Sequence, residues 1–223
     1  MNDDKTADQL IKEIYQRLMA AYGPQHWWPA ETPFEVMAGA VLTQSAAWAN
    51  VEKAICNLKT AQALSPDSIR NMPFPELAEL IKPSGYYNAK ARKLKSLVYW
   101  LWEKFADDIA KMAKEETQKL REETLTVYGI GPETADSILL YALEKPVFVI
   151  DAYTKRIFSR IGLMEEEKSY NDFQRFFMSN LTPDVTVFNE YHALLVNLAK
   201  EACNKHPDCR KCCLVDICRY EER

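Results

Sequence analysis

The chain has 223 residues and a formal net charge of -4, and 48% of its residues are hydrophobic and 27% are charged. This balance excludes a disordered chain and permits one large or two small domains with cores of their own. The 6 glycines are too few for the tight turns of an all-β fold. No apolar run reaches the length of a membrane span and residues 1–4 show no secretion signal, so we expect a cytoplasmic protein, associated with the nucleoid in a bacterium. The net charge does not indicate nucleic-acid binding, so such a role would need a local surface patch.

The spacing of apolar residues predicts one helix after another, and therefore an all-α fold. A capping pattern at 32–35, with proline at the first helical position, begins a helix whose apolar face ends at Leu42, and Asn88 is a candidate cap for a helix that runs to Trp102. The other predicted helices cover residues 6–21, 46–58, 107–112, 115–127, 133–143, 152–162, 170–180 and 186–202. The stretch before Asn88 is divided into short helices and turns by Pro66, Pro73, Pro75 and Pro83. Residues 147–150 are compatible with either a short strand or a buried connection.

Two glycines separate the helices predicted on either side of residue 130. Gly129 and Gly131 flank Ile130, and Pro132 follows at the start of the next helix. Glycine lets the backbone approach a partner closely, and the next helix presents free N–H groups and the positive end of its dipole. These features predict a surface that binds phosphate without net positive charge. The alternative is an ordinary corner between two helices, because short glycine motifs are weak signals.

The cysteines gather at the end of the chain. Five of the 6 fall in the last turn-rich stretch, at Cys203, Cys209, Cys212, Cys213 and Cys218. A terminal cluster of this kind indicates a metal or cluster site, since a secreted disulfide scaffold would spread its cysteines through the chain. The spacing favours Cys203, Cys209, Cys212 and Cys218 as ligands, with Cys213 as a substitute for Cys212. Four thiolates can bind either a [4Fe–4S] cluster or Zn²⁺. The remaining cysteine, Cys56, is expected to be a small buried core residue.

Further segments complete a pattern that resembles a known family. They are residues 40–44 (AVLTQ), 85–91 (GYYNAKA), 129–135 (GIGPETA) and 149–151 (VID). With the cysteine cluster, they resemble the helix–hairpin–helix DNA glycosylase superfamily, in its endonuclease III branch. The resemblance implies a monomer of two helical domains, which binds double-stranded DNA containing a damaged base in the cleft between them. One domain, barrel-like and of six helices, is expected at residues 25–143, and the other, with the cysteine loop, at residues 1–24 and 144–223.

The resemblance also implies a cofactor and a reaction. It favours a [4Fe–4S] cluster over zinc, although the first gap between cysteines has five residues here and six in the family. Asp151 matches the catalytic aspartate, which stabilises positive charge at the anomeric carbon and activates water. Bifunctional members carry a nucleophilic lysine where this chain has Glu133, and a carboxylate cannot form a Schiff base. We therefore expect a monofunctional DNA N-glycosylase without efficient abasic-site lyase activity; a non-catalytic DNA-binding module is the alternative.

Two adjacent tryptophans point to a substrate. Trp27 and Trp28 follow His26 in a predicted loop, and Trp48 lies near the start of a later helix. These rings either plug the core or hold a flipped base, and indole faces suit a positively charged alkylated purine. The segment resembles the 3-methyladenine DNA glycosylase III type, in which the three tryptophan positions line the base pocket, and His26 either touches the base or packs in the loop. An oxidised pyrimidine or a mismatched base is the alternative substrate.

Other residues are expected to contact the duplex. The resemblance makes Gln44 a filler of the gap left by the flipped nucleotide and Tyr86 a wedge, although Gln44 could instead form a hydrogen bond at a helix end. Thr134 belongs to the hairpin with the two glycines.

Basic side chains are candidates for phosphate contacts, or for a solvated charged face. They are Lys90, Arg92, Lys93 and Lys95 at one helix start, and Arg156 after Asp151. His192 lies in an apolar predicted helix and is interpreted as structural.

Overall fold

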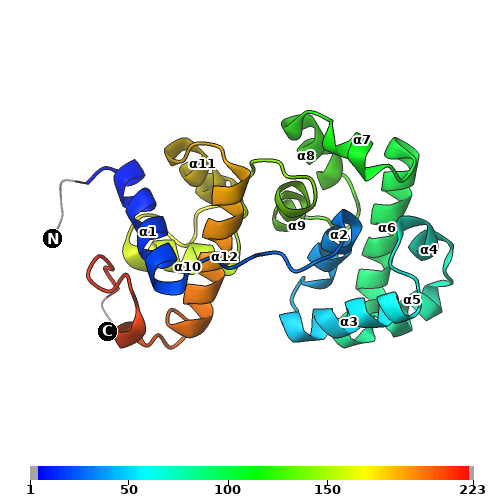
Figure 1. The fold of residues 1–223 in the computed structure, drawn as a ribbon, viewed down its shortest axis with the longest axis horizontal. Helices are drawn as coiled ribbons and strands as arrows, with labels where there is room; N and C mark the ends of the chain where they lie inside the picture. The colour runs from blue at the N-terminus through cyan, green and yellow to red at the C-terminus, as the bar shows by residue number, and fades with distance from the viewer. Residues whose placement is uncertain (1–4, 221–223) are drawn as a thin grey trace. The chain divides into compact units, whose positions relative to one another are not determined.

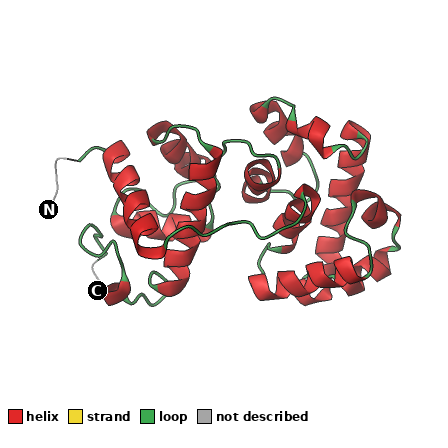
Figure 2. Ribbon diagram, in the orientation of Figure 1, coloured by secondary structure: helices red, strands yellow, loops and turns green. Residues whose placement is uncertain are grey.

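A computed structural model describes residues 5–220, and within that range every regular element is helical (Figure 2), which confirms the all-α prediction. The longer helices, in chain order, are α1 (Ala7–Tyr22), α2 (Pro33–Leu42), α3 (Trp48–Thr60), α6 (Tyr87–Phe105), α8 (Thr117–Leu125), α10 (Ala152–Ile161), α11 (Tyr170–Asn180) and α12 (Val185–Glu201). The shorter ones are α4 (Pro66–Asn71), α5 (Phe74–Leu80), η1 (Lys82–Ser84), α7 (Ile109–Ala113), α9 (Pro132–Ser137), a π-helical turn η2 (Ile138–Ala142) and η3 (Cys209–Lys211).

Three expectations about the chain's ends and segments can now be placed. Residues 1–4, on which the expectation about a secretion signal depends, lie outside the described residues. Of the helices in residues 5–220, none combines the length and the apolar character that crossing a membrane requires. Residues 147–150 are a buried connection and not a strand.

The chain forms two compact units (Figure 1). The central unit is Trp28–Lys145, and the terminal unit takes in the chain up to Trp27 and from Pro146 onwards. The sequence-based domain boundaries, at 25 and 143, stay a prediction. The central unit contains the glycine hairpin and two of the tryptophans of interest, whereas the terminal unit contains Asp151 and the cysteine loop.

Helix α2 is the centre of the central unit. It packs against α3, α6, α9 and η2, and its residues from Phe34 to Leu42 are all buried. The sequence had suggested one apolar face, but a helix that is apolar on every side is stable only when other helices surround it. Pro33 in the first turn and a hydrogen bond from the Glu35 N–H to the Thr32 hydroxyl, at 3.1 Å, begin the helix as the capping pattern predicts.

The terminal unit is built on α12, which packs against α1 and α10. Its core is aromatic: the rings of Phe148 and Phe177 stack with centroids 4.0 Å apart, and Tyr191 meets both edge-on. The Tyr191 hydroxyl donates a hydrogen bond to the carbonyl oxygen of Ile11 at 2.8 Å, which ties α12 to α1. The buried connection at residues 147–150 ends at Asp151, so this core fixes where α10 begins.

Candidate functional site

The glycine hairpin lies between α8 and α9. Gly129 has φ +79°, a left-handed conformation that glycine adopts without a steric penalty, and Gly131 is the N-cap of α9. The two helices are joined by a two-pronged ion pair, in which Arg121 Nε and Nη2 lie 2.6 and 3.0 Å from the two carboxylate oxygens of Asp136. The Asp136 side chain is fully buried, so the pair holds the hairpin in one geometry.

Gln44 joins the loop after α2 to this hairpin. Its Nε2 donates hydrogen bonds to the Gly129 carbonyl oxygen at 3.1 Å and to Thr134 Oγ1 at 2.9 Å, and its Oε1 accepts one from Lys93 Nζ. The aliphatic stem of Lys93 lies over Gly129 so closely that a Cβ there would be 2.3 Å from Lys93 Cγ. Gln44 thus joins two loops through its side-chain hydrogen bonds, and its role in the duplex stays a prediction.

Lys90 does not lie on the surface, and its prediction as a phosphate contact is wrong. It is 2% exposed, and its Nζ donates hydrogen bonds to the carbonyl oxygens of Leu42 at 2.8 Å and Ser84 at 2.6 Å. Burial, with a further contribution from Lys93, lowers the pKa of Lys90 to about 8. The side chain therefore fastens together the two loops that carry Gln44 and Tyr86.

Tyr86 is the most exposed large hydrophobic side chain among the described residues. It is 75% exposed, and it has φ +44°, which is uncommon for a residue with a side chain. It also serves as the N-cap of α6, a role that the sequence had suggested for Asn88. A strained, solvent-facing aromatic residue of this kind fits an insertion role better than a packing role.

Trp28 and Trp48 meet in the central unit. Their ring centroids are 5.2 Å apart and their planes are nearly perpendicular, and Trp28 also contacts Tyr141 at 5.4 Å. Trp28 packs directly on α2 because residue 39 is glycine: a Cβ there would lie 3.1 Å from Trp28 Cζ2. The two indoles line a cavity of about 250 Å³, whose described lining includes neither Trp27 nor His26.

Acidic and basic groups surround this cavity. Glu35 is buried, with its carboxylate 2.9 Å from Lys59 Nζ and bonded to the N–H of Glu31 at 3.0 Å. Glu52 and Cys56 also line the cavity. Cys56 is exposed, so its prediction as a buried core residue is wrong; its position on α3 faces outward from the helix's buried stripe.

Asp151 begins α10 in the terminal unit. Its Oδ1 accepts a hydrogen bond from the Thr154 N–H at 2.7 Å, and its Oδ2 lies 3.6 Å from His192 Nε2. The carboxylate side chain is 14% exposed. Burial by itself would raise the pKa of Asp151, but the His192 imidazole and the Thr154 N–H outweigh it, so the pKa lies below its ordinary value. The group is therefore an ionised carboxylate at neutral pH with limited access to solvent.

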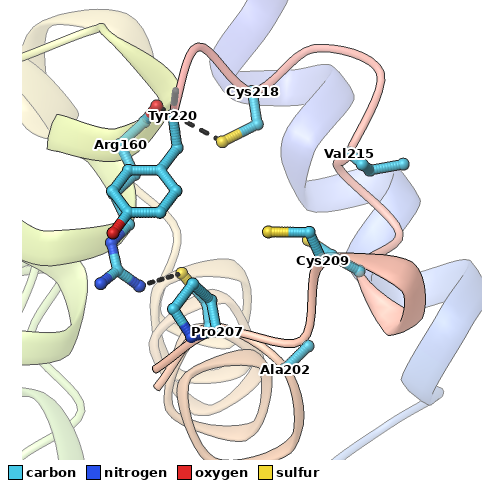
Figure 3. Close-up of a pocket in the computed structure, with 9 residues that line it drawn as sticks. Arg160, Ala202, Pro207, Cys209, Val215, Cys218 and Tyr220 are labelled. Carbon is cyan, nitrogen blue, oxygen red and sulfur yellow. Dashed lines mark hydrogen bonds between the residues drawn. The ribbon is translucent and has the colours of Figure 1, made fainter. Parts of the chain in front are cut away.

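The cysteine loop encloses one pocket. Its lining includes the four sulfur-bearing residues favoured by the spacing, whereas Cys213 is not part of it. In Figure 3 the side chains of Cys209 and Cys218 both extend into this space, and the ring of Tyr220 lies against Arg160. Arg160 Nη1 donates to Cys203 Sγ at 3.3 Å, and the Arg160 carbonyl oxygen accepts a hydrogen bond from Cys218 Sγ at 3.3 Å.

Arg156 is also directed at this loop. Its guanidinium donates two hydrogen bonds to the carbonyl oxygen of Cys203, at 3.0 and 2.8 Å, and it lies over the ring of Tyr153. The side chain predicted to contact phosphate is thus engaged in fastening the loop to α10.

Two residues of this site were missed from the sequence. His192 was interpreted as structural because it lies in an apolar helix, and nothing in the local pattern shows that α12 brings it to Asp151. Lys93 was included in a basic run, and only its partner Gln44, 49 residues earlier, reveals its role.

The chain is similar to DNA repair proteins. A family model described as "HhH-GPD superfamily base excision DNA repair protein" matches residues 38–183. A protein of Methanocaldococcus jannaschii, provisionally named a DNA repair glycosylase, is 45% identical over 212 residues, which are 94% of this chain and 96% of that protein. Endonuclease III of Thermotoga maritima is 25% identical over 216 residues, which are 96% and 94% of the two chains.

Solved structures show the same similarity. The H. pylori 3-methyladenine DNA glycosylase, bound to an ethenoadenine, is 28% identical with a TM-score of 0.74, over 88% of this chain and 98% of that one. Endonuclease III in a non-covalent DNA complex has a TM-score of 0.81 at 21% identity, over 96% of each chain, which shows a shared fold.

Proposed function

Because this chain belongs to the HhH-GPD superfamily of base excision DNA repair proteins, in its endonuclease III branch, we propose that it is a monofunctional glycosylase for alkylated purines. It is a DNA glycosylase by family; the proposal concerns the substrate and the chemistry. We propose that it acts on double-stranded DNA, from which it removes a flipped base resembling 3-methyladenine.

The observation that carries this proposal is the cavity beside Trp28 and Trp48. Its volume of about 250 Å³ lies just below the range of roughly 300–1,000 Å³ for drug-sized ligands, so a single heterocycle suits it. Indole faces attract a cationic base through stacking and cation–π interaction, worth about 0.5–2 kcal/mol each. Lys59, which also lines the cavity, neutralises Glu35, so the carboxylate of Glu52 supplies the remaining negative charge, which favours a positively charged base over a neutral pyrimidine. The H. pylori relative that was solved with an ethenoadenine supports a purine ligand.

The proposed reaction uses water and Asp151. As the bond between the anomeric carbon and the base nitrogen breaks, the ionised carboxylate stabilises the positive charge that develops on the sugar. A water oxygen then bonds to the anomeric carbon, and its proton goes to the Asp151 carboxylate. The base departs with the bonding electron pair, and an alkylated purine does so readily because it carries positive charge beforehand.

Glu133 supports hydrolysis over strand cleavage. It is exposed at the start of α9, at the position where bifunctional relatives carry the lysine nucleophile. A carboxylate there cannot form the covalent sugar intermediate that a lysine forms. Borohydride with abasic DNA should therefore trap no covalent complex, and efficient trapping would refute the monofunctional assignment.

We further propose that the hairpin of Gly129, Gly131 and Thr134 contacts the phosphate backbone, while Gln44 and Tyr86 enter the duplex. The exposure of Tyr86 and the bonds between Gln44 and the hairpin support this, because they gather the candidate residues on one unit. Replacing Tyr86 by alanine should weaken binding to DNA with a flipped nucleotide more than binding to an intact duplex.

We infer that the cysteine loop holds a [4Fe–4S] cluster, which the resemblance to the endonuclease III branch favours over zinc. Four cysteines line one pocket whose walls also include the apolar Ala202, Pro207 and Val215. Within residues 5–220, no group of three or more cysteine, histidine or acidic side chains is close enough to hold a single ion. We propose that the cluster, when bound, cross-links the loop through Cys203, Cys209, Cys212 and Cys218.

The cluster proposal has a matched pair of variants. The purified protein should be brown and contain iron and sulfide, and a colourless protein with stoichiometric zinc would refute the assignment. Cys212→Ser should lose the visible absorbance and the iron, whereas Cys213→Ser should keep both, because Cys213 is not part of the pocket.

Base release decides the substrate. The protein is incubated with methylated and with oxidised duplex DNA, and the released bases are identified. We expect methylated purines, with Asp151→Asn reducing the rate by orders of magnitude while DNA binding persists. Release of oxidised pyrimidines or of mismatched bases would overturn the alkylpurine assignment but keep the glycosylase, and an unchanged rate in the variant would refute the role of Asp151. Trp48→Ala should slow release, and Trp102→Ala, which removes an exposed indole on α6, is the control.

A further inference from the structure

His192 faces the carboxylate of Asp151 across the interface between α10 and α12. Its Nε2 lies 3.6 Å from Asp151 Oδ2, and the two side chains are 8% and 14% exposed. The other carboxylate oxygen accepts the hydrogen bond from the Thr154 N–H at 2.7 Å. Each oxygen of the carboxylate is thus approached by a polar group, one from its own helix and one from α12.

Several other charged groups on the neighbouring elements are engaged elsewhere. On α10, Lys155 Nζ donates to the carbonyl oxygen of Lys168, and Arg156 donates to Cys203. On α12, Glu190 accepts a hydrogen bond from the N–H of Gln25.

A further polar group near Asp151 comes from α11. The Tyr170 hydroxyl accepts a hydrogen bond from the N–H of Ile150 at 3.3 Å, directly before Asp151. Tyr170 therefore fixes the backbone at this point, and the His192 ring is the neighbour from another element that lies against the carboxylate itself.

We propose that His192 is a positioning residue that holds the Asp151 carboxylate ionised and in place, and that it thereby sets the acidic limit of the pH range for base excision. This inference rests on the proposed role of Asp151 in hydrolysis. The histidine touches neither sugar nor base in this scheme; it acts through the carboxylate.

The physical reason is a balance of opposing effects on Asp151. Burial favours the protonated acid, whereas the imidazole of His192 and the Thr154 N–H favour the carboxylate, and together they hold the pKa of Asp151 below its ordinary value. Without the imidazole, only the N–H and the hydroxyl of Thr154 are left to oppose burial, so we expect the pKa of Asp151 to rise. A protonated acid can neither stabilise positive charge on the sugar nor accept a proton from water.

The test compares His192→Leu with His192→Gln and with a neighbour on the same helix. Leucine removes the polar group, whereas glutamine keeps a donor. Tyr191→Phe is the matched control, because it removes a buried hydrogen bond of α12, from the Tyr191 hydroxyl to Ile11, without touching Asp151. Single-turnover base release is followed from pH 4.5 to 9, with Asp151→Asn supplying the background of spontaneous base loss.

We expect His192→Leu to move the acid limb of the profile upward by about one pH unit, which is about a tenfold loss of rate on that limb with the plateau retained. His192→Gln should restore most of the wild-type profile, and Tyr191→Phe should leave the acid limb in place. An unmoved limb in His192→Leu would overturn the proposal, as would an equal shift in Tyr191→Phe, since the effect would then be a general loosening of α12.

A second measurement does not depend on the substrate. The side-chain carboxyl carbons of aspartate are labelled with ¹³C, Asp151 is identified by its absence in Asp151→Asn, and its titration is followed by NMR. We expect a higher midpoint in His192→Leu than in the wild type, and equal midpoints would overturn the proposal. If the enzyme released a base other than an alkylated purine, the substrate assignment would fail while both tests of His192 could still be made.

Discussion

Replacing Lys90 by methionine tests whether a buried ammonium group fastens the two loops of the central unit. Methionine matches the length of the lysine stem but donates no hydrogen bond, so the carbonyl oxygens of Leu42 and Ser84 lose their donor. Each buried carbonyl that lacks a partner costs about 1–3 kcal/mol. The same change relieves the cost of burying a charge. Since burial lowers the pKa of Lys90 from 10.5 to about 8, that cost is about 3 kcal/mol at pH 7.

At neutral pH the lost hydrogen bonds and the relieved cost of burying a charge oppose each other. At alkaline pH the burial cost disappears from the wild type, so the two effects can be told apart. Below pH 8 Lys90 is charged in both the folded and the unfolded chain, and the burial cost is fully present. Between about pH 8 and 10.5 the unfolded chain binds the proton and the folded chain does not, so wild-type stability rises with pH in that window. The stability of the methionine variant has no such dependence on pH, because methionine does not titrate. The difference in free energy of unfolding between wild type and Lys90→Met should therefore widen by about 2 kcal/mol between pH 7 and 9.5.

Urea denaturation followed by tryptophan fluorescence measures this difference, because Trp28, Trp48, Trp100 and Trp102 all belong to the central unit. Arg92→Met is the control, since Arg92 is exposed on the same helix. Subtracting each variant from the wild type at the same pH cancels the titration of all the other groups. A difference that stays constant from pH 7 to 9.5 would show that the ammonium group is not buried as described.

Three further predictions concern the hairpin. Asp136→Asn should destabilise the protein by about 3 kcal/mol in urea denaturation, because it removes the buried carboxylate that pairs with the partly buried Arg121 guanidinium; an effect below 1 kcal/mol would contradict the pairing. Gly129→Ala should weaken DNA binding about tenfold in a fluorescence anisotropy titration, because its φ of +79° is strained for alanine by about 1–2 kcal/mol and the Lys93 stem must move. Gly131→Ala, with no atom within 4 Å of the added Cβ, is its control and should bind normally. Glu133→Lys should produce a borohydride-trapped complex with abasic DNA that the wild type does not form, and no trapping would show that position 133 does not face the sugar.

Most helices could be predicted because their signals are local. Proline at the first turn and threonine as the cap define the start of α2 within the chain itself. The cap of α6 could not be predicted in this way. Asn88 has the better capping side chain, but the cap is Tyr86, two residues earlier, because the loop before the helix is fastened by Lys90 to the end of α2. A tertiary hydrogen bond thus overrides a local preference.

The candidate residues whose role depends on their residue type and spacing could be predicted from the sequence. The residues whose role depends on tertiary packing could not. Asp151 and the cysteine loop were found through their spacing and their resemblance to a family. The buried state of Lys90 was not, because a lysine in a basic run has the same local pattern whether it faces solvent or a pair of carbonyl oxygens. The role of His192 likewise could not be predicted, because it follows Asp151 by 41 residues in the sequence. The two side chains meet only because α12 packs against α10.

The hydrogen-bond partners of the basic side chains explain how a protein with a net negative charge can bind DNA. Lys93 is directed at Gln44, Arg156 at the Cys203 carbonyl and Arg160 at the cysteine loop, so these charges act within the protein. A cation bonded to a backbone carbonyl or an amide adds positive potential near the surface while its geometry is fixed by the fold. The proposed contacts to phosphate would then come from backbone N–H groups at Gly131 and the following turn, which carry no formal charge. Net charge counts these cations without showing where they lie, and it does not count backbone N–H groups at all, so the composition alone gives no sign of the partner that the hairpin and the family indicate.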